Sequence, residues 1–219
     1  MNVKLISYSG APEGVELNNL EELVAFCARV SNPSNQYNSH TASKLIKYLI
    51  KNKHWSPLEM VNVCLEIETT RDIARQILRH RSFSFQEFSQ RYADPVKELD
   101  FVLREARLQD TKNRQNSILT EDKQLQEEWN TRQEKLIELV KETYTWAISK
   151  GIAKEQARVL LPEGLTKSRM YVNGTVRSWI HYIDVRSGTD TQREHMLIAR
   201  ECAKVISELF PLSKDFVRE

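Results

Sequence analysis

The chain has 219 residues, with 32 Lys and Arg against 30 Asp and Glu and a formal net charge of +2. This balance excludes a histone-like protein or one that coats a polyanion, because such proteins are strongly basic. Hydrophobic residues make up 40% of the chain, and its low Gly and Pro content excludes a disordered or collagen-like chain. No composition break marks a linker, so we predict one domain over residues 1–219.

Simple sequence patterns bear on the cellular compartment and on the roles of the cysteines and histidines. The N-terminus lacks the apolar core of a signal peptide, and no stretch reaches the roughly 18 apolar residues of a spanning helix. We therefore expect a soluble, cytoplasmic protein with no membrane partner. Cys27, Cys64 and Cys202 are far apart, which rules out a CxxC metal or redox motif. His40 and His195 have no partner at metal-ligand spacing, so we predict no metal site.

Hydrophobic periodicity predicts an α+β fold, a helix-rich domain around a small, mostly antiparallel sheet. Apolar residues that recur every three or four positions favour helices, and alternation favours strands. In chain order the predicted elements are a strand over 3–8, helices over 20–30 and 41–54, a strand over 61–67, a helix over 70–80, a long amphipathic helix over 120–150, a short helix over 154–160, a strand over 167–173, and helices over 176–186 and 191–209. Residues 94–116 are polar and mixed, and we expect most of them to form a loop.

The predicted helix over 70–80 places three arginines on one face. Arg71, Arg75 and Arg79 are spaced by four residues, and like charges at this spacing destabilise a helix by about 0.2–0.5 kcal/mol per pair. A solvated surface tolerates such repulsion. The pattern is better explained by an anion bound across the face.

The next segment changes pattern. If residues 84–92 are extended, then Glu87, Ser89 and Arg91 point the same way at a spacing of two. A carboxylate, a hydroxyl and a guanidinium on one face suit a sugar hydroxyl and a phosphate. An ordinary strand with a salt-bridged edge fits the same residues.

One motif in this region is specific. Arg79, His80 and Arg81 are followed, after seven residues, by Ser89, and this run resembles the RHR-x7-S signature of the flavin-dependent thymidylate synthases. Further stretches resemble the same family at consistent places, namely residues 28–31, 54–59, 154–162 and 177–186. The resemblance covers most of the chain and weakens over residues 94–150 and the last few residues.

The resemblance implies an activity, its cofactors and its partners. Proteins of this family convert dUMP to dTMP, with methylenetetrahydrofolate as the carbon donor, FAD as the hydride carrier and NADPH as the reductant. It further implies a homotetramer whose active sites are shared between subunits. No cysteine in this sequence is a convincing nucleophile, and a flavin that donates hydride makes one unnecessary.

The resemblance also implies site residues. Arg186 would lie by the uracil ring and promote ionisation at N3, where a fixed guanidinium stabilises developing negative charge. His54 is the second candidate catalytic residue and, with Tyr92, a folate-side residue. The implied FAD-binding residues are Ser56, Glu59, Arg79, His80, Arg81, Glu87, Thr175, Arg177 and His181. The implied dUMP-binding residues are Gln76, Arg79, Glu87, Ser89, Gln90, Arg91, Arg158 and Arg186.

Plain structural interpretations exist for several of these residues. His54 follows a probable helix end, where an imidazolium would cap the dipole. His181 by itself is typical of a packed histidine, and Ser89 of a structural hydroxyl. Arg177 and Arg186 are nine residues apart, so they do not share a face of a straight helix and would serve different ligands or subunits.

The sequence departs from the family pattern at two positions, and one segment has no counterpart. Gln86 replaces the common Asn, and Asp190 replaces a common His, so Asp190 is left out of the site. Residues 109–117 have no counterpart, and we hypothesise a mobile loop that closes over dUMP or NADPH.

The alternative function is a non-enzymatic nucleic-acid-binding module that uses the basic helix of residues 71–91. This stretch holds five arginines against Asp72 and Glu87, while the rest of the chain has a net charge of −1. The basic cluster is short, and Glu87 would oppose a phosphate backbone, so we favour the enzyme and expect no nucleic-acid partner. The cluster is sized for small phosphorylated ligands.

Overall fold

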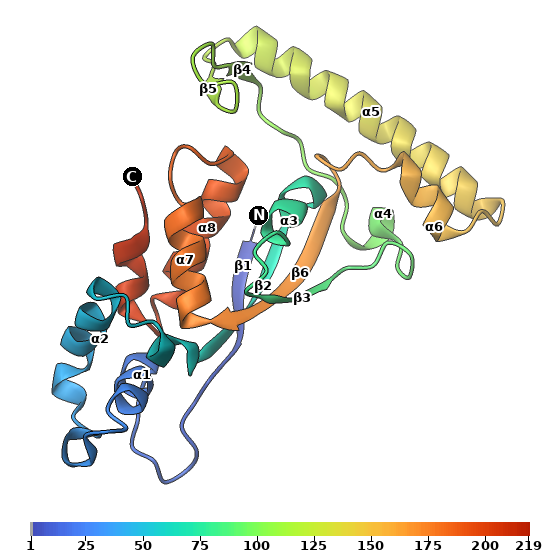
Figure 1. Cartoon of the computed structure of the whole chain (residues 1–219). Coiled ribbons are helices and arrows are strands. Elements are labelled where there is room, and N and C mark those ends of the chain that lie inside the picture. Colours follow the sequence, from blue (N-terminus) through green and yellow to red (C-terminus); the bar gives the residue numbers. More distant parts are fainter. Residues whose placement is uncertain (1) are drawn as a thin grey trace. The chain divides into compact units, whose positions relative to one another are not determined.

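A computed structural model describes residues 2–219, which form two compact units interleaved along the sequence (Figure 1). Unit 1 comprises the chain up to Ile67, His80–Phe85 and Tyr171–Glu219. Unit 2 comprises Glu68–Arg79 and Gln86–Met170. The prediction of one domain over residues 1–219 stays a prediction. Within residues 2–219, no helix has the length and apolar character needed to cross a membrane.

The main sheet has four strands in the order β1-β2-β6-β3. These strands are β1 (Asn2–Tyr8), β2 (Asn62–Thr70), β6 (Lys167–Thr175) and β3 (Ser84–Glu87). Along the chain, β2, β3 and β6 each continue from one unit into the other. The predicted fold class, helix-rich with a small antiparallel sheet, is confirmed.

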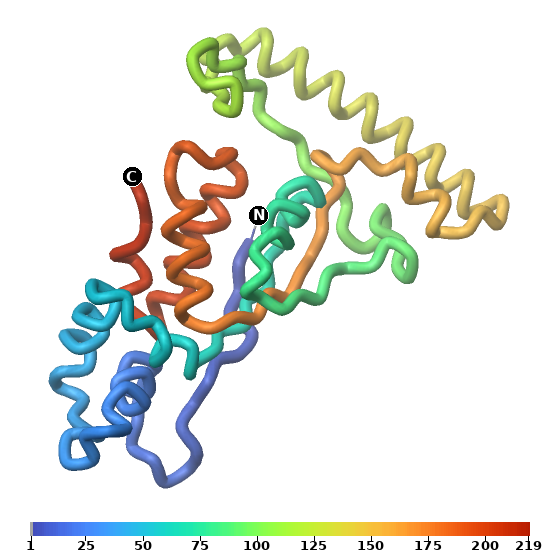
Figure 2. The backbone as a smooth tube through the Cα atoms, viewed as in Figure 1, coloured from blue at the N-terminus to red at the C-terminus, as the bar shows by residue number. Residues whose placement is uncertain are grey.

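Unit 1 holds four helices, which are α1 (Leu20–Ala28), α2 (Ala42–Lys51), α7 (Val176–Arg186) and α8 (Arg193–Ile206). The helices α7 and α8 pack side by side (Figure 2). Trp179 and Ile183 of α7 are fully buried, and the Trp179 indole N–H donates to the Val63 carbonyl over 2.9 Å. Burial of these side chains sets the rotation of α7 about its axis.

Unit 2 holds α3 (Arg71–Ile77), α4 (Pro95–Glu98), α5 (Lys123–Ser149) and α6 (Lys154–Ala157). Val140, Tyr144 and Ala147 of α5 form a core with Phe101 and Leu165. This core uses one face of a helix of 27 residues. The other faces of α5 face solvent within unit 2.

Residues 94–116 form mostly loop, as predicted, but the region also contains regular elements that the sequence did not indicate. This region contains α4 and the strand β4 (Arg107–Gln109), which pairs antiparallel with β5 (Ser117–Leu119). The turn between them is held by the Asp110 carboxylate, which accepts from the backbone N–H of Lys112 and Asn113 over 2.8 and 3.1 Å. These hydrogen bonds lower the pKa of Asp110. The hypothesis that residues 109–117 close over a ligand stays untested.

The segment after α3 is anchored by an aromatic side chain. Phe83 is buried, and its ring centroid lies 4.6 Å from that of Trp179. Gly174 of β6 lies so close that a Cβ added there would be 2.2 Å from the Phe83 ring. Glycine at this position therefore permits the contact that holds residues 80–83 against α7.

Gly174→Ala is expected to destabilise the protein by about 1–3 kcal/mol, because the added methyl group overlaps the Phe83 ring. Urea denaturation measures the change. Gly10→Ala is the matched control, since a Cβ at Gly10 meets no atom within 4 Å. Equal unfolding midpoints for the two variants would contradict the expected clash.

Candidate active site

The predicted site residues divide between the two units. Unit 1 holds His54, Ser56, Glu59, His80, Arg81, Thr175, Arg177, His181 and Arg186. Unit 2 holds Gln76, Arg79, Glu87, Ser89, Gln90, Arg91, Tyr92 and Arg158.

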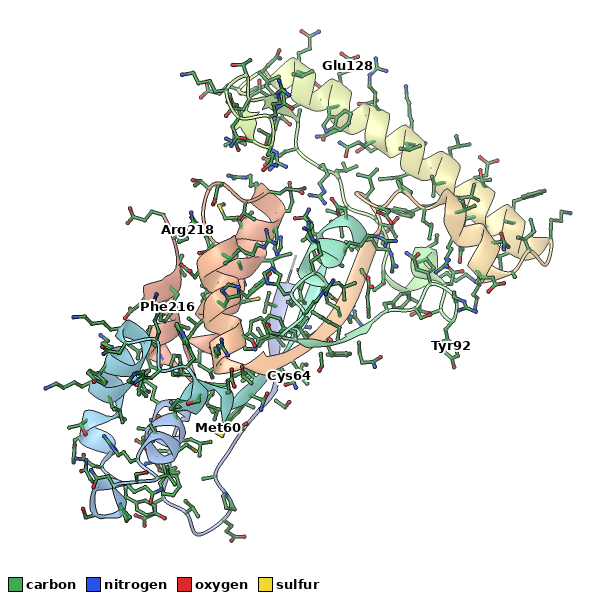
Figure 3. All side chains as sticks on the ribbon, viewed as in Figure 1. Met60, Cys64, Tyr92, Glu128, Phe216 and Arg218 are labelled. Carbon is green, nitrogen blue, oxygen red and sulfur yellow. The ribbon has the colours of Figure 1, made fainter. Side chains whose placement is uncertain are left out.

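A cavity of about 600 Å³ opens beside the N-terminal half of α7 in unit 1. Three predicted residues, Glu59, Arg177 and His181, line it. Phe216 reaches it from the C-terminal segment, where Figure 3 labels it. The remaining lining residues are Trp55, Ser82, Ser178, Ile180 and Asp184.

The first turn of α7 presents polar groups to this cavity. Thr175 is the N-cap, and its hydroxyl accepts from the Ser178 backbone N–H over 3.2 Å. The Ser178 hydroxyl donates to the Ser82 carbonyl over 3.2 Å. A helix N-terminus carries a partial positive charge, so this end of the cavity favours an anion.

Arg177 forms an ion pair with Glu59 across the cavity. The two side chains are 49% and 39% exposed. An ion pair this exposed contributes about 0–1 kcal/mol, so an anionic ligand replaces the carboxylate at little cost. Arg177 is therefore a cationic side chain that can exchange its carboxylate partner for an anionic ligand in the cavity.

His80 and Arg186 meet inside unit 1. The Arg186 Nε–H donates to His80 Nε2 over 2.9 Å. Because a ring nitrogen that accepts a hydrogen bond carries no proton, this contact holds His80 neutral with its proton on Nδ1. Arg177 contacts Glu59 instead, so the two arginines of α7 have different side-chain partners. That they serve different ligands or subunits stays a prediction.

A buried pair lies behind His80. The His80 ring packs edge-on against Tyr182, with centroids 5.0 Å apart, and Tyr182 Oη lies 3.1 Å from His195 Nε2. Burial lowers the pKa of His195 to about 3, and the nearby Arg186 and His80 side chains lower it further. Burial raises the pKa of Tyr182. Both rings are neutral at neutral pH, so they support His80 without adding charge.

In unit 2, Glu87 is held by the protein's own groups. Its carboxylate lies 3.2 Å from the Arg71 guanidinium and accepts from the Ser168 hydroxyl over 2.7 Å. Arg75 pairs with Glu163 over 2.6 Å. Two of the three aligned arginines therefore have carboxylate partners, which offset the repulsion between them.

The structure contradicts an extended chain over residues 84–92. The strand ends at Glu87, and the Ser89 carbonyl accepts from the backbone N–H of Tyr92 and Ala93 over 3.1 and 3.0 Å. These hydrogen bonds close a turn, so the spacing-two face of Glu87, Ser89 and Arg91 does not form. The condition for that interpretation is therefore not met, because local backbone hydrogen bonds override the alternation after Glu87.

The turn presents one unsatisfied donor. Gln90 is 6% exposed, and its side-chain Nε2 has no hydrogen-bond partner among residues 2–219. A buried polar atom without a hydrogen-bond partner lowers the stability of the fold, and an acceptor atom of a bound ligand would supply the missing hydrogen bond. Arg91 pairs with Glu155 over 3.2 Å, and Lys154 donates to the Tyr92 carbonyl over 2.8 Å, which ties the turn to α6.

The remaining cationic residues are exposed. Arg79, Arg81 and Arg158 face solvent, and Arg158 begins the short helical turn Arg158–Leu160 that follows α6. Gln76 is partly buried on α3. The α3 helix ends at Ile77, so Arg79 lies beyond the predicted arginine face.

His54 lies just beyond the end of α2. Its backbone N–H donates to the Leu49 carbonyl over 2.8 Å, and the Lys53 N–H donates to the Ile50 carbonyl over 3.0 Å. Lys53 has a φ of 60°, and the two bonds form a Schellman cap. The backbone thus caps the helix, while the ring packs edge-on against Tyr48. A catalytic role for His54 stays a prediction.

Two further candidates are exposed. Ser56 begins the turn Ser56–Glu59 that carries Glu59 to the cavity. Tyr92 is 87% exposed, and Figure 3 shows its side chain pointing away from the ribbon. Asp190, which the sequence analysis left out of the site, lies 3.3 Å from the guanidinium of Arg218.

Sequence reasoning missed several cavity residues. Asp184 lies seven residues after Arg177 and three after His181, so helical periodicity places all three on one face of α7. Ser178 follows the cap residue by three positions, the spacing of an N-cap hydrogen bond. Phe216 gave no signal, because it comes from a remote part of the sequence. Among residues 2–219 no group of three metal-ligating side chains gathers.

The sequence matches the family described as "Thymidylate synthase complementing protein" over residues 13–212. It is 50% identical over 212 residues to the probable flavin-dependent thymidylate synthase of Paramecium bursaria Chlorella virus 1, with 96% of each chain covered. It is 48% identical over 191 residues to the flavin-dependent thymidylate synthase of Synechocystis sp., with 87% of this chain and 86% of that relative covered.

Solved structures with a similar fold include the UMP/dUMP methylase PolB from Streptomyces cacaoi. The form bound with 5-Br UMP has a TM-score of 0.79 and 22% identity, and covers 98% of this chain and 92% of that one. The form bound with 5-Br dUMP has a TM-score of 0.75 and 26% identity, with 98% and 93% covered.

His195 is buried in its neutral form, so we expect the free energy of unfolding to decrease as the pH falls. Its pKa is about 3 when folded, against about 6.5 in an unfolded chain. The unfolded state therefore binds the proton first. Stability from this group is complete above about pH 6.5 and is lost progressively towards pH 3, by about 1.4 kcal/mol per pH unit.

Urea titrations across this pH range measure the dependence. His195→Gln is expected to flatten it, while His40→Gln, which replaces an exposed histidine, retains it. Equal pH dependence in His195→Gln and the unmodified chain would show that His195 is not the group responsible.

Proposed function

This chain belongs to the flavin-dependent thymidylate synthases, the thymidylate synthase complementing protein family, and we propose which of its residues carry out the reaction. It is an enzyme that methylates dUMP to dTMP and uses FAD. In this proposal methylenetetrahydrofolate donates the carbon and NADPH reduces the flavin. The protein itself binds, orients and supplies electrostatic stabilisation.

The unit 1 cavity has the size of a ligand pocket and a lining that suits part of FAD. Its volume of about 600 Å³ lies within the usual range of ligand pockets. The first turn of α7 offers the partial positive charge of a helix N-terminus and the Arg177 guanidinium, which suit phosphate oxygens. Glu59 and His181 line the same cavity, which supports their proposed roles in FAD binding. When bound, FAD supplies the hydride.

The turn after β3 fits the nucleotide substrate. The unpartnered Gln90 Nε2 is a donor that a carbonyl or phosphate oxygen of dUMP would satisfy. The Arg91–Glu155 pair is 65% and 50% exposed, so the Arg91 guanidinium exchanges readily onto a phosphate. Ser89 and Arg158 complete the proposed dUMP residues of this region. Glu87 positions Arg71 and Ser168 and is the weakest candidate for direct contact.

The observation that carries the catalytic proposal is the hydrogen bond between Arg186 and His80. It joins the second residue of the RHR motif to the last turn of α7. The Nε–H of Arg186 is held by His80, which leaves the planar Nη groups for the uracil ring. A guanidinium fixed in this way stabilises negative charge that develops at N3 and O4 without reorganising.

We propose in addition that the enzyme is a cytoplasmic homotetramer with active sites shared between subunits. This proposal follows from the family to which the chain belongs.

The nucleic-acid alternative requires an exposed arginine face, because phosphate neutralisation drives such binding. The side chain of Arg71 is 16% exposed and pairs with Glu87, and Arg75 pairs with Glu163. Arg71 is held in a largely buried pair, and the carboxylate of Glu163 beside the exposed Arg75 would repel a duplex backbone, so the geometry favours small phosphorylated ligands.

Arg186→Ala is expected to lower the rate of dTMP formation by about 100- to 1,000-fold, the usual effect of removing one such donor. Flavin should remain bound, because Arg186 does not line the unit 1 cavity. Turnover of dUMP and retained flavin absorbance measure the two effects. Lys204→Ala, which removes an exposed cation of α8, is the control and keeps full activity. Undiminished turnover in Arg186→Ala would refute the assigned role.

Gln90→Leu separates a ligand role from a structural one. If Nε2 serves dUMP, KM for dUMP rises by about tenfold or more while stability is kept or improved, since an unpaired buried amide is lost. Steady-state kinetics and urea denaturation give the two readouts. A loss of stability with unchanged KM would assign Gln90 to the fold alone.

A further inference from the structure

One long face of α5 is apolar and uncovered within unit 2. Figure 1 shows the length of this helix, and Figure 3 labels Glu128 on it. Its exposed apolar side chains are Leu125 at 37%, Trp129 at 41%, Leu136 at 46%, Leu139 at 59% and Trp146 at 54%. A contiguous set of large apolar side chains in solvent marks an interaction surface.

These side chains follow the spacing of a coiled-coil seam. The positions advance by alternating steps of four and three residues along α5, and we name them the α5 seam: Leu125, Trp129, Arg132, Leu136, Leu139, Thr143 and Trp146. The buried residues Gln133, Val140 and Ala147 lie on a neighbouring face. The α5 seam is therefore a helix-pairing surface distinct from the face that packs in unit 2.

We propose that the α5 seam binds the α5 seam of a second copy of this chain, antiparallel and about a two-fold axis between Leu136 and Leu139. In this alignment Leu136 meets Leu139 of the second copy, and Trp129 meets Trp146 of the second copy. Every contact occurs twice, as in an isologous interface. Arg132 meets Thr143 of the second copy, whose small side chain leaves room for the arginine stem.

Charge favours the same alignment. Lys135 and Glu142 flank the seam on one side, and both are exposed. The axis that pairs residues 136 and 139 also brings Lys135 near Glu142 of the second copy, which gives two opposite-charge pairs. A parallel, in-register alignment would instead place Arg132 against Arg132, and like charges at an interface are unfavourable.

This inference rests on the proposed homotetramer, to which it assigns one interface. A second copy is the proposed partner because the α5 seam is complementary to itself in both size and charge.

Leu139→Glu tests the interface in the full-length chain with FAD bound. We expect the mass from sedimentation velocity to fall twofold, with an unchanged circular dichroism spectrum, because Leu139 is 59% exposed and outside the unit 2 core. Glu138→Lys changes charge on α5 off the seam and should leave the mass unchanged. Lys135→Glu is expected to weaken assembly, and the double variant Lys135→Glu, Glu142→Lys to restore it.

Three results would overturn the inference. An unmodified chain that is monomeric removes both the homotetramer and this interface. An oligomer whose mass Leu139→Glu does not change keeps the homotetramer but refutes the α5 seam as its interface. A lower unfolding temperature in Leu139→Glu at constant mass means that another part of the same chain covers the seam.

Discussion

The hydrogen bond between Arg186 and His80 is the constraint on which the proposed catalytic arrangement depends. Its geometry follows from packing: Trp179 and Ile183 are buried, so the last turn of α7 has one orientation, and Phe83 holds the segment that carries His80. The neutral Tyr182 and His195 behind the ring leave Arg186 as the charge of this cluster. A guanidinium held by a neutral acceptor keeps its full charge for the substrate.

Much of the fold could be predicted from the sequence, and particular elements show why. The bounds of α7 were predicted correctly, because Thr175 caps it and buried residues recur with helical period. The hairpin of β4 and β5 was missed because polar backbone contacts around Asp110 hold it, and these leave no hydrophobic period. Local hydrogen bonds of this kind are visible only in three dimensions.

The candidate site, like the fold, could be predicted from the sequence only in part. The RHR motif pointed to His80, but its partner Arg186 lies 106 residues away, and no spacing rule connects them. Glu87 was predicted as a ligand contact, yet Arg71 and Ser168 hold it. Sequence identifies which residue types the chemistry needs. Tertiary packing decides which of them face a ligand and which neutralise one another.

The distribution of charge explains the choice of ligand. The near-neutral chain concentrates arginines in residues 71–91, and a stripe of this kind would suit a polymer of phosphates if all of it were exposed. Glu87 and Glu163 neutralise Arg71 and Arg75, while Arg79 and Arg81 stay exposed. A short cationic site flanked by carboxylates repels a long polyanion but accommodates a single nucleotide or dinucleotide. The carboxylates that lie beside these arginines therefore favour a small anion over a polymer in the proposed site.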